Sequence, residues 1–320
     1  MAPMLTVTLA HPGVLDALEG AADGVPAQVR LVGWDPADPL PDGVAPADVA
    51  AVVLARADRD RLRALETLPA LRLVQLPSAG FEHALAHAPV RAALCNARGV
   101  HDAGTAELAV GLLLAAQRGI DDAVRDAQEG VWRPRERRSL ADRRVMVLGH
   151  GSIGAAVARR LEPFEVVVVR VARTARVEDG AVVHGADELA RLLPTVDAVV
   201  VVLPLTEATR GLLDAAALAA LPDGALVVNV GRGAVVDTDA LVAEVTAGRL
   251  RAALDVVDPE PLPADHPLWR APGVILTPHV GGASDATVPR MAALVRAQVT
   301  ALATGTALRN VVREPREDRS

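Results

Sequence analysis

One stretch of the sequence, residues 143–173, constrains the fold more than any other. A short apolar run at Val145–Leu148 is typical of a buried parallel strand, and it leads directly into a Gly-x-Gly-x-x-Gly motif at Gly149–Gly154. A stretch of helical composition, 155–161, follows, and a second apolar run at Val166–Val171 completes the pattern. This order predicts a strand–helix–strand unit of a parallel sheet, with a glycine turn between the first strand and the helix.

Each glycine of the motif meets a physical requirement of such a turn. The first permits the tight bend, the second lets the backbone approach a pyrophosphate, and the third lets the helix pack against the strand. The N-terminus of the helix offers unpaired N–H groups and the positive end of the helix dipole to phosphates. We therefore predict a dinucleotide site at Gly149, His150, Gly151, Ser152, Ile153 and Gly154.

Composition limits the remaining possibilities. A chain of 320 residues favours two domains, and a hydrophobic content of 51% with only 2% aromatic residues indicates cores of Ala, Val and Leu. The net charge of −7, without a long basic run, argues against a nucleic-acid partner. The apolar stretches are short and interrupted, and the start of the chain does not resemble a signal peptide. We expect a cytoplasmic protein without a membrane span.

Missing residue types narrow the chemistry further. The chain has no lysine, which excludes Schiff-base catalysis and the phosphate-binding P-loop, and no tyrosine, which excludes a Tyr/Lys proton relay. Proton transfer therefore depends on His, Asp or Glu. The single cysteine, Cys95, has apolar neighbours and is interpreted as an inert buried thiol. His83 and His87 are four residues apart but have no third ligand nearby, so we expect no metal site.

Strand and helix patterns alternate along the whole chain, which predicts an open α/β architecture. Strands are expected at 4–10, 29–32, 49–54, 71–76, 93–96, 197–203, 225–230, 252–256 and 274–277. Helices are expected at 59–68, 103–118, 189–193, 214–221, 239–246 and 285–303. The charged tail, 313–320, is predicted to be disordered, and the arginine cluster at 133–138 is interpreted as a solvated surface or a subunit contact.

Three ionisable residues follow predicted strands downstream of the glycine turn. They are Arg232, Glu260 and His279, which follow the strands at 225–230, 252–256 and 274–277. In doubly wound sheets, ligands bind outside the carboxyl ends of the strands. Arginine offers a planar fork of donors to a carboxylate, histidine titrates near neutrality, and a carboxylate beside it orients the ring and favours its protonated form. Such a set suits hydride transfer to a 2-oxo acid, although each residue alone also has an ordinary structural explanation.

A turn in the first half of the chain adds a possible anion site. Ser78, Ala79 and Gly80 follow the strand predicted at 71–76. A turn of this composition exposes successive backbone N–H groups, to which a carboxylate could bind. Turns of this kind are common, so the pattern alone is weak.

Several segments together resemble those of the D-isomer-specific 2-hydroxyacid dehydrogenases, in the order in which that family has them. They are Gly149–Gly154, Leu203–Thr206, Val228–Gly233, Ala253–Pro261 and Thr277–Gly282, together with Asn96–Glu107 and Ser78–Gly80. The resemblance implies two Rossmann-like, doubly wound parallel-sheet α/β domains, with the cofactor domain inserted into the substrate-binding domain. The expected ranges are 1–97 for the first part of the substrate-binding domain, 98–284 for the dinucleotide domain, and 285–320 for the returning helix and charged tail.

The resemblance also implies roles for individual residues. Arg232, Glu260 and His279 would form the catalytic set, and the backbone N–H groups around Ala79 and Gly80, with Ser78, would hold the substrate carboxylate. Contacts to the cofactor are expected from the glycine motif and from Thr105, Arg173, Thr174, Leu203, Pro204, Val230, Gly231, Asp255, His279 and Gly281. A homodimer formed through the cofactor domain is expected as well.

The segment after the second strand of the dinucleotide unit bears on the choice of cofactor. An acid there usually binds the ribose 2′-hydroxyl of NAD, but no acid follows until Glu178. Arg173 and Thr174 are suited to a 2′-phosphate, with Arg170 and Arg176 adding diffuse attraction. The sequence thus favours NADP over NAD. The alternatives are that these arginines are merely solvated, or that Glu178 or Asp179 folds back onto the ribose.

The first hypothesis for function is an NAD(P)-dependent D-2-hydroxyacid dehydrogenase that reduces a 2-oxo acid of the glyoxylate or hydroxypyruvate type. A formate dehydrogenase is disfavoured, because those relatives have Gln where Glu260 stands, whereas a phosphite-oxidising enzyme keeps the Glu and stays open. A second hypothesis, from another class, is a non-catalytic dinucleotide sensor similar to the corepressors of this fold.

Overall fold

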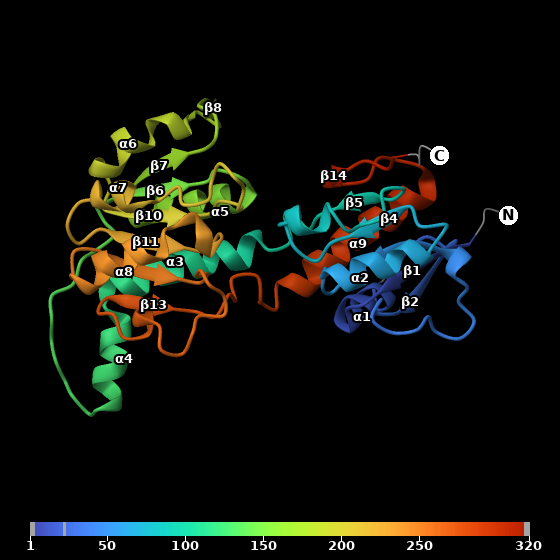
Figure 1. The fold of residues 1–320 in the computed structure, drawn as a ribbon, viewed down its shortest axis with the longest axis horizontal. Helices are drawn as coiled ribbons and strands as arrows, with labels where there is room; N and C mark the ends of the chain where they lie inside the picture. The colour runs from blue at the N-terminus through green and yellow to red at the C-terminus, as the bar shows by residue number, and fades with distance from the viewer. Residues whose placement is uncertain (1–3, 22–23, 317–320) are drawn as a thin grey trace. The chain divides into compact units, whose positions relative to one another are not determined.

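The computed structural model describes residues 4–21 and 24–316, which fold into two compact units (Figure 1). The first unit comprises the chain up to His101 together with the segment from Asp285 onwards, and the second comprises Asp102–Ser284. The sequence predicted divisions after residues 97 and 284, whereas the units divide after His101 and Ser284. The roles assigned to the two domains stay predictions.

The first unit has a six-stranded sheet in the order β14-β5-β4-β3-β1-β2. Its strands are β1 (Leu5–Leu9), β2 (Val29–Gly33), β3 (Val49–Val53), β4 (Leu73–Gln75), β5 (Ala93–Cys95) and β14 (Val311–Arg313). Its helices are α1 (Pro12–Glu19), α2 (Arg59–Ala64) and α9 (Thr287–Thr304). All the strands are parallel except β14, so β1 to β5 have the 2-1-3-4-5 order of flavodoxin-like sheets.

The second unit has an eight-stranded sheet in the order β13-β12-β11-β10-β6-β7-β9-β8. Its strands are β6 (Arg144–Leu148), β7 (Val167–Val171), β8 (Arg176–Glu178), β9 (Ala181–His184), β10 (Ala198–Val201), β11 (Leu226–Asn229), β12 (Arg251–Leu254) and β13 (Val274–Leu276). Its helices are α3 (Asp102–Arg118), α4 (Ile120–Gln128), α5 (Ser152–Leu161), α6 (Leu189–Leu192), α7 (Ala215–Ala219) and α8 (Thr238–Thr246).

Short 3₁₀ helices connect several of these elements in both units. They are Pro46–Asp48, Leu65–Thr67, Glu82–Ala84, Glu162–Phe164, Ala186–Glu188, Leu193–Thr195, Gly233–Val235 and Pro267–Trp269. The two sheets with their helices confirm the predicted doubly wound α/β fold class.

The second sheet has the strand arrangement of a dinucleotide-binding fold. All its strands are parallel except β8, and the order β9-β7-β6-β10-β11-β12 corresponds to the 3-2-1-4-5-6 order of Rossmann sheets. Side chains of β6 alternate between the two faces: Val145 and Val147 pack with α3 and α5, while Met146 and Leu148 pack with the cluster under α6, α7 and α8. The strand order reverses between β6 and β10, which is where ligands bind in such sheets.

Five of the helices and strands were absent from the predictions. They are α1, α4, β14 and the two strands of the β8–β9 hairpin, whose two-residue loop is Asp179-Gly180. Both loop residues have positive φ, 50° and 77°, as the tight turn of a two-residue hairpin requires.

The prediction of a disordered tail is wrong for residues 313–316. Arg313 is the last residue of β14, and its guanidinium donates hydrogen bonds to the carbonyls of Leu85, Ala88 and Pro89. The N–H of Arg316 donates to the carbonyl of Val90 at 2.8 Å. Tertiary hydrogen bonds therefore order a segment whose composition suggested disorder, while residues 317–320 lie outside the described part of the chain. Across the described residues, no helix is long and apolar enough to cross a membrane.

Candidate active site

The glycine turn lies between β6 and α5, and its geometry explains why each glycine is needed. Gly149 has φ 108°, and a Cβ there would lie 2.8 Å from the carbonyl oxygen of Val202. A Cβ on Gly154 would lie 1.8 Å from the carbonyl oxygen of Gly149, so the helix contacts the turn backbone directly. A Cβ on Gly151, the residue before α5, would point into open space. This cradle fits the pyrophosphate of a dinucleotide.

A cavity of about 390 Å³ extends from this turn along the ends of β7 and β10. It is lined by Gly149, His150, Gly151, Ala172, Arg173, Thr174, Arg176, Val202, Leu203 and Pro204. Seven of the residues predicted to contact the cofactor therefore line one cavity. Burial lowers the pKa of the His150 imidazole, against the opposing effect of Glu178, which favours a neutral ring in the turn.

The charged residues after β7 are arranged differently from one another. Arg170 pairs with Glu162 at 2.9 Å and its side chain is only 17% exposed, so its guanidinium lies beside the C-terminal end of α5. Arg176 lines the cavity, and its guanidinium pairs with Glu178 at 2.5 Å. The hydrogen bond from Arg176 lowers the pKa of the Glu178 carboxyl. The first acid after β7 is thus engaged by an arginine of its own hairpin.

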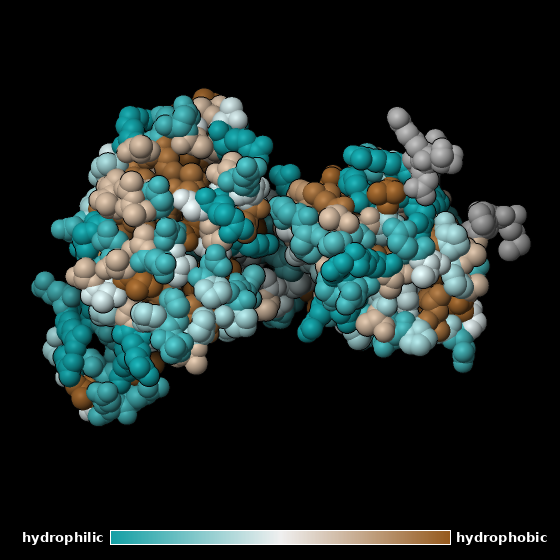
Figure 2. Space-filling model, viewed as in Figure 1, coloured by the Kyte–Doolittle hydropathy of each residue, from teal (hydrophilic) through white to brown (hydrophobic). Residues whose placement is uncertain are grey.

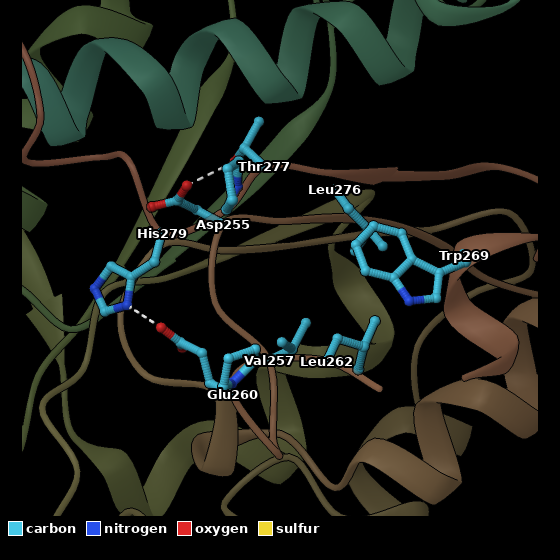
Figure 3. Close-up of a pocket in the computed structure, with 10 residues that line it drawn as sticks. Asp255, Val257, Glu260, Leu262, Trp269, Leu276, Thr277 and His279 are labelled. Atoms are coloured by element: carbon cyan, nitrogen blue, oxygen red, sulfur yellow. Dashed lines mark hydrogen bonds and ion pairs between the residues drawn. The ribbon is translucent and has the colours of Figure 1, made fainter. Parts of the chain in front are cut away.

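Asp255, which directly follows β12, holds the turn after β13 through hydrogen bonds (Figure 3). Its carboxylate is 3% exposed and accepts three hydrogen bonds, from the Thr277 hydroxyl at 2.6 Å, the Val280 N–H at 2.9 Å and the Gly281 N–H at 2.9 Å. The carbonyl of Asp255 also accepts the His279 N–H at 2.8 Å. These bonds hold His279 at a φ of 53°, a left-handed conformation that non-glycine residues rarely adopt.

This turn directs the His279 ring toward Glu260 on the loop that follows β12. Nδ1 of His279 lies 2.5 Å from Oε1 of Glu260, with the two side chains 47% and 40% exposed (Figure 3). A carboxylate on Nδ1 fixes the ring orientation and leaves Nε2 as the atom directed away from the pair. The structure thus joins two of the three predicted catalytic residues in one hydrogen-bonded pair.

Arg232 follows β11, the strand next to β12, so it lies at the same edge of the sheet. Asn229 shapes its turn by accepting the Gly231 N–H at 3.0 Å and donating to the Arg232 carbonyl at 3.0 Å. The guanidinium donates to the Gly231 carbonyl at 2.7 Å. Within the described residues, no hydrogen bond joins Arg232 to the histidine–glutamate pair.

Beside the pair lies a mainly apolar cavity of about 430 Å³. Figure 3 shows Leu262, Leu276 and Trp269 on its far side from His279, with Val257 between them and Glu260. The Trp269 indole N–H donates to the carbonyl of Pro263 at 2.8 Å, which fixes the ring on the cavity wall. These residues were not predicted, because their common location depends on a loop of irregular structure between β12 and β13.

The other residues predicted for the cofactor site lie at neighbouring strand ends. A Cβ on Gly281 would contact the side chain of Thr105 from α3 at 3.4 Å, and a Cβ on Gly231 would lie 2.7 Å from the Leu203 carbonyl oxygen. Val230 is 6% exposed and donates its N–H to the carbonyl of Val201. These close approaches bring the ends of β10, β11 and β13 together with the start of α3.

Ser78, Ala79 and Gly80 lie in the first unit, on the loop after β4. Asn96 donates to the Ala79 carbonyl at 2.7 Å, and the Ser78 hydroxyl donates to the Gly80 carbonyl at 2.8 Å. Within the described part of the chain, the N–H groups of Ala79 and Gly80 form no hydrogen bond. The loop therefore offers two backbone donors, as a carboxylate site requires.

Two further sequence predictions concern Cys95 and metal binding. Cys95 is fully buried in β5, where burial raises the pKa of its thiol to about 12, in agreement with an inert thiol. In the described ranges, 4–21 and 24–316, no group of three or more His, Cys, Asp or Glu residues is placed to hold a metal ion.

A Rossmann-type sheet, a glycine turn that fits a pyrophosphate, and a histidine–carboxylate pair at the same sheet edge define the class of dinucleotide-dependent dehydrogenases. Comparison with known proteins gives the family. The profile of the D-isomer specific 2-hydroxyacid dehydrogenase NAD-binding domain matches residues 110–281. The chain belongs to the D-isomer specific 2-hydroxyacid dehydrogenase family and is an NAD(P)-dependent oxidoreductase.

Individual relatives agree with this assignment. The chain is 32% identical to a glyoxylate reductase of Thermofilum pendens over 78% of this chain and 76% of that protein. It is 31% identical to a mouse glyoxylate reductase/hydroxypyruvate reductase over 92% of this chain and 94% of that protein. A solved structure of an NADPH-dependent glyoxylate/hydroxypyruvate reductase from Sinorhizobium meliloti, with NADP and malonate, has 29% identity and a TM-score of 0.77, covering 99% of each chain.

Proposed function

We propose that this enzyme reduces a small 2-oxo acid of the glyoxylate or hydroxypyruvate type to the D-2-hydroxy acid, with NADPH as its preferred cofactor. The observation that carries the proposal is the 2.5 Å contact between His279 and Glu260 in the sheet that also bears the glycine turn. The names of several relatives support the substrate class.

In the proposed reaction, His279 is the general acid. The glycine turn, Gly149–Gly154, would hold a nicotinamide cofactor, which would supply the hydride for the carbonyl carbon of the substrate. Nε2 of the protonated His279 donates its proton to the carbonyl oxygen, which becomes the hydroxyl group. Glu260 accepts a hydrogen bond from the Nδ1–H group and so orients the ring with Nε2 free for the transfer.

Two further groups are proposed to bind the substrate. The Arg232 guanidinium provides several donors in a plane, suited to the carboxylate and carbonyl oxygens of a 2-oxo acid. The N–H groups of Ala79 and Gly80, on the loop of Ser78, are proposed to bind the carboxylate. The free donors of that loop support this assignment.

The preference for NADPH is proposed on the residues that line the cavity after β7. Arg173 and Thr174 lie on its wall, and the first acid of the segment, Glu178, is paired with Arg176. A 2′-phosphate with roughly two negative charges is favoured by the arginines, and the residues that line the cavity include no carboxylate. Solved structures of similar proteins contain NADP or NADPH, which agrees with this choice.

The test of the proposed function is a turnover assay with glyoxylate, hydroxypyruvate, pyruvate and phenylpyruvate, each with NADPH and with NADH. We expect the highest kcat/KM for glyoxylate or hydroxypyruvate with NADPH. Absence of turnover with all four acids, together with tight dinucleotide binding, would favour a sensor without catalysis. Oxidation of phosphite with NADP⁺ would favour the phosphite-oxidising alternative.

We also propose that the enzyme is a homodimer formed through its cofactor domain. Three large apolar side chains of this domain are exposed to solvent. They are Ile120 (50%) and Val124 (52%) on α4, and Trp132 (95%) in the segment that follows α4. Figure 2 shows hydrophobic residues among hydrophilic ones over α4. Large apolar side chains left in water favour burial against a second subunit. Sedimentation of the wild type and of Trp132→Ser tests this, since the variant should form fewer dimers at low protein concentration.

A further inference from the structure

A cavity of about 320 Å³ lies at the amino ends of β11, β12 and β13. Its lining comes from the second unit alone: the end of α3, the start of α4, the segment 136–138, and the turns that precede the three strands. Because β6 and β10 to β13 are parallel, the glycine turn and the histidine–glutamate pair lie at the other edge of the sheet, where these strands end. The cavity is thus separate from the candidate active site.

Two guanidinium groups meet at this cavity without a carboxylate partner. Arg251, the first residue of β12, donates from Nε and Nη2 to the carbonyl of Gly224, both at 3.2 Å, and from Nη1 to the carbonyl of Ala116 at 3.0 Å. Arg138 donates to the same Gly224 carbonyl at 2.9 Å. Within the described residues, neither arginine forms an ion pair. Two positive charges therefore share one neutral acceptor.

The charge of Arg251 is the more costly of the two, because this side chain is partly buried. Burial lowers the pKa of the Arg251 guanidinium, and the charge of Arg138 lowers it further, against the opposing effect of Asp121. Asp121 itself pairs with Arg125 at 2.7 Å. Buried charges in proteins are ordinarily paired with an opposite charge, so Arg251 lacks the partner that its surroundings call for.

The other acids of the cavity lining do not supply that partner. Asp122 is held by Arg125 and Arg137, both at 2.7 Å. Glu136 also lines the cavity, but in the part of the chain that the structure describes it forms no ion pair. The lining therefore keeps an excess of positive charge beside Gly224.

A buried amide next to Arg251 lacks a partner as well. Gln117, near the end of α3, is 2% exposed, and its Oε1 accepts a hydrogen bond from Nη2 of Arg251 at 2.6 Å. Because a guanidinium only donates, this contact fixes which end of the amide is the oxygen. The other end, Nε2, is buried and has no hydrogen-bond partner among the described residues. A buried donor without an acceptor is costly, and it indicates that a partner from outside the chain belongs here.

We propose that this cavity binds a phosphate-type dianion, held by Arg138, Arg251 and Nε2 of Gln117. Such an ion has roughly two negative charges and three acceptor oxygens, so it neutralises both guanidinium groups and also accepts from the amide. A single carboxylate would leave one arginine unpaired. The bound ion would join α3 and the segment 136–138 to the amino ends of the strands. This inference does not depend on the 2-oxo acid or on the cofactor preferred by the active site.

Two competing explanations assign the arginines other roles. In the first, Arg138 and Arg251 only brace the edge of the sheet through the carbonyls that they contact. In the second, an acidic side chain of a second subunit pairs with them. Both explanations predict that inorganic phosphate does not bind at this edge.

The experiment is isothermal titration calorimetry with inorganic phosphate at constant ionic strength. The full-length protein is first saturated with NADPH or NADH, whichever binds more tightly, so that the glycine turn is filled. We expect one phosphate per chain, and weaker binding of acetate. Arg138→Gln should weaken phosphate binding roughly ten- to a hundredfold, as expected for loss of a hydrogen bond to a charged group. Gln117→Glu gives Arg251 a carboxylate in place of Oε1 and should abolish phosphate binding.

Two further variants locate the bound ion. Arg144→Gln is the matched control, because Arg144 on β6 is also exposed and donates to a carbonyl, that of Thr195, but lies outside the cavity. It should bind phosphate as the wild type does, and so should Arg232→Ala, which separates this cavity from the proposed substrate site. Circular dichroism should show that the variants are folded. If Gln117→Glu does not fold, Arg138→Gln decides, since its side chain is exposed.

Three results would overturn the proposal. They are absence of phosphate binding by the wild type, equal affinity of the wild type and Arg138→Gln, and loss of binding in Arg232→Ala. None of them bears on the reduction of 2-oxo acids, which the turnover assay tests separately.

Discussion

Replacing Glu260 by Gln isolates the electrostatic part of its interaction with His279. Gln has the same size and keeps a carbonyl oxygen that can accept a hydrogen bond from Nδ1 across the 2.5 Å contact, so the ring keeps its orientation. What is lost is the negative charge beside the ring. Since the proposed reaction uses a positively charged His279 as its acid, loss of this charge should lower kcat/KM for reduction.

The exposure of the pair sets the size of the effect. The side chains are 47% and 40% exposed, so solvent screens the interaction, and exposed ion pairs contribute about 0.2–1 kcal/mol. Since about 1.4 kcal/mol corresponds to a tenfold change, kcat/KM should fall about 1.5- to fivefold.

The assay measures kcat and kcat/KM for glyoxylate reduction at pH 7, for the wild type and for Glu260→Gln. Glu19→Gln, on the exposed surface of α1, is the matched control for loss of one carboxylate and should keep the wild-type kinetics. A kcat/KM for Glu260→Gln equal to that of the wild type would refute the electrostatic coupling and leave Glu260 a purely structural role.

Three other outcomes are expected. His279→Ala and Arg232→Ala should lower kcat/KM by about 10²–10⁴-fold, while the Kd for NADPH, measured by fluorescence titration, changes little. A wild-type kcat in His279→Ala would refute the assignment of His279 as the general acid. Arg173→Ala should raise the KM for NADPH roughly ten- to a hundredfold and leave that for NADH unchanged, as kinetics with both cofactors would show. The pKa of Asp58 is lowered by the N–H and the guanidinium of Arg61, so this pair stabilises the fold above about pH 4 and is lost as the pH falls through the lowered value. Arg61 also pairs with Asp35, whose pKa is lowered as well, so urea unfolding of Arg61→Gln should show a deficit at pH 7 that shrinks as the pH falls through the two lowered pKa values.

The glycine turn was predictable because its requirements are local. Gly149 needs its positive φ and Gly154 its missing Cβ whatever the rest of the chain does, so a strand followed by that spacing is enough. The position of His279 at a strand end was predictable for a similar reason. Its left-handed conformation was not, since the bonds that hold it come from Asp255, more than twenty residues earlier in the sequence.

The elements that sequence reasoning missed are short or depend on partners far away in the chain. The Asp179-Gly180 pair between Val177 and Val182 is a recognisable hairpin pattern, but the strands it joins have only three and four residues. The pairing of Arg176 with Glu178 rather than with solvent follows from that hairpin. In the first unit, Val311–Arg313 becomes a strand because β5 offers it an unpaired edge, and no local composition reports such an edge.

That last strand has a consequence for the solubility of the protein. β5 is a parallel strand whose outer side would present open N–H and C=O groups to any extended peptide if β14 were absent. β14 closes this side with an antiparallel pairing of only three residues and ends it with Arg313, whose guanidinium covers three loop carbonyls. A chain shortened before Val311 would therefore keep the His279–Glu260 pair and the glycine turn but expose a template for intermolecular strand addition. β14 thus covers an edge of the sheet to which another chain could add a strand.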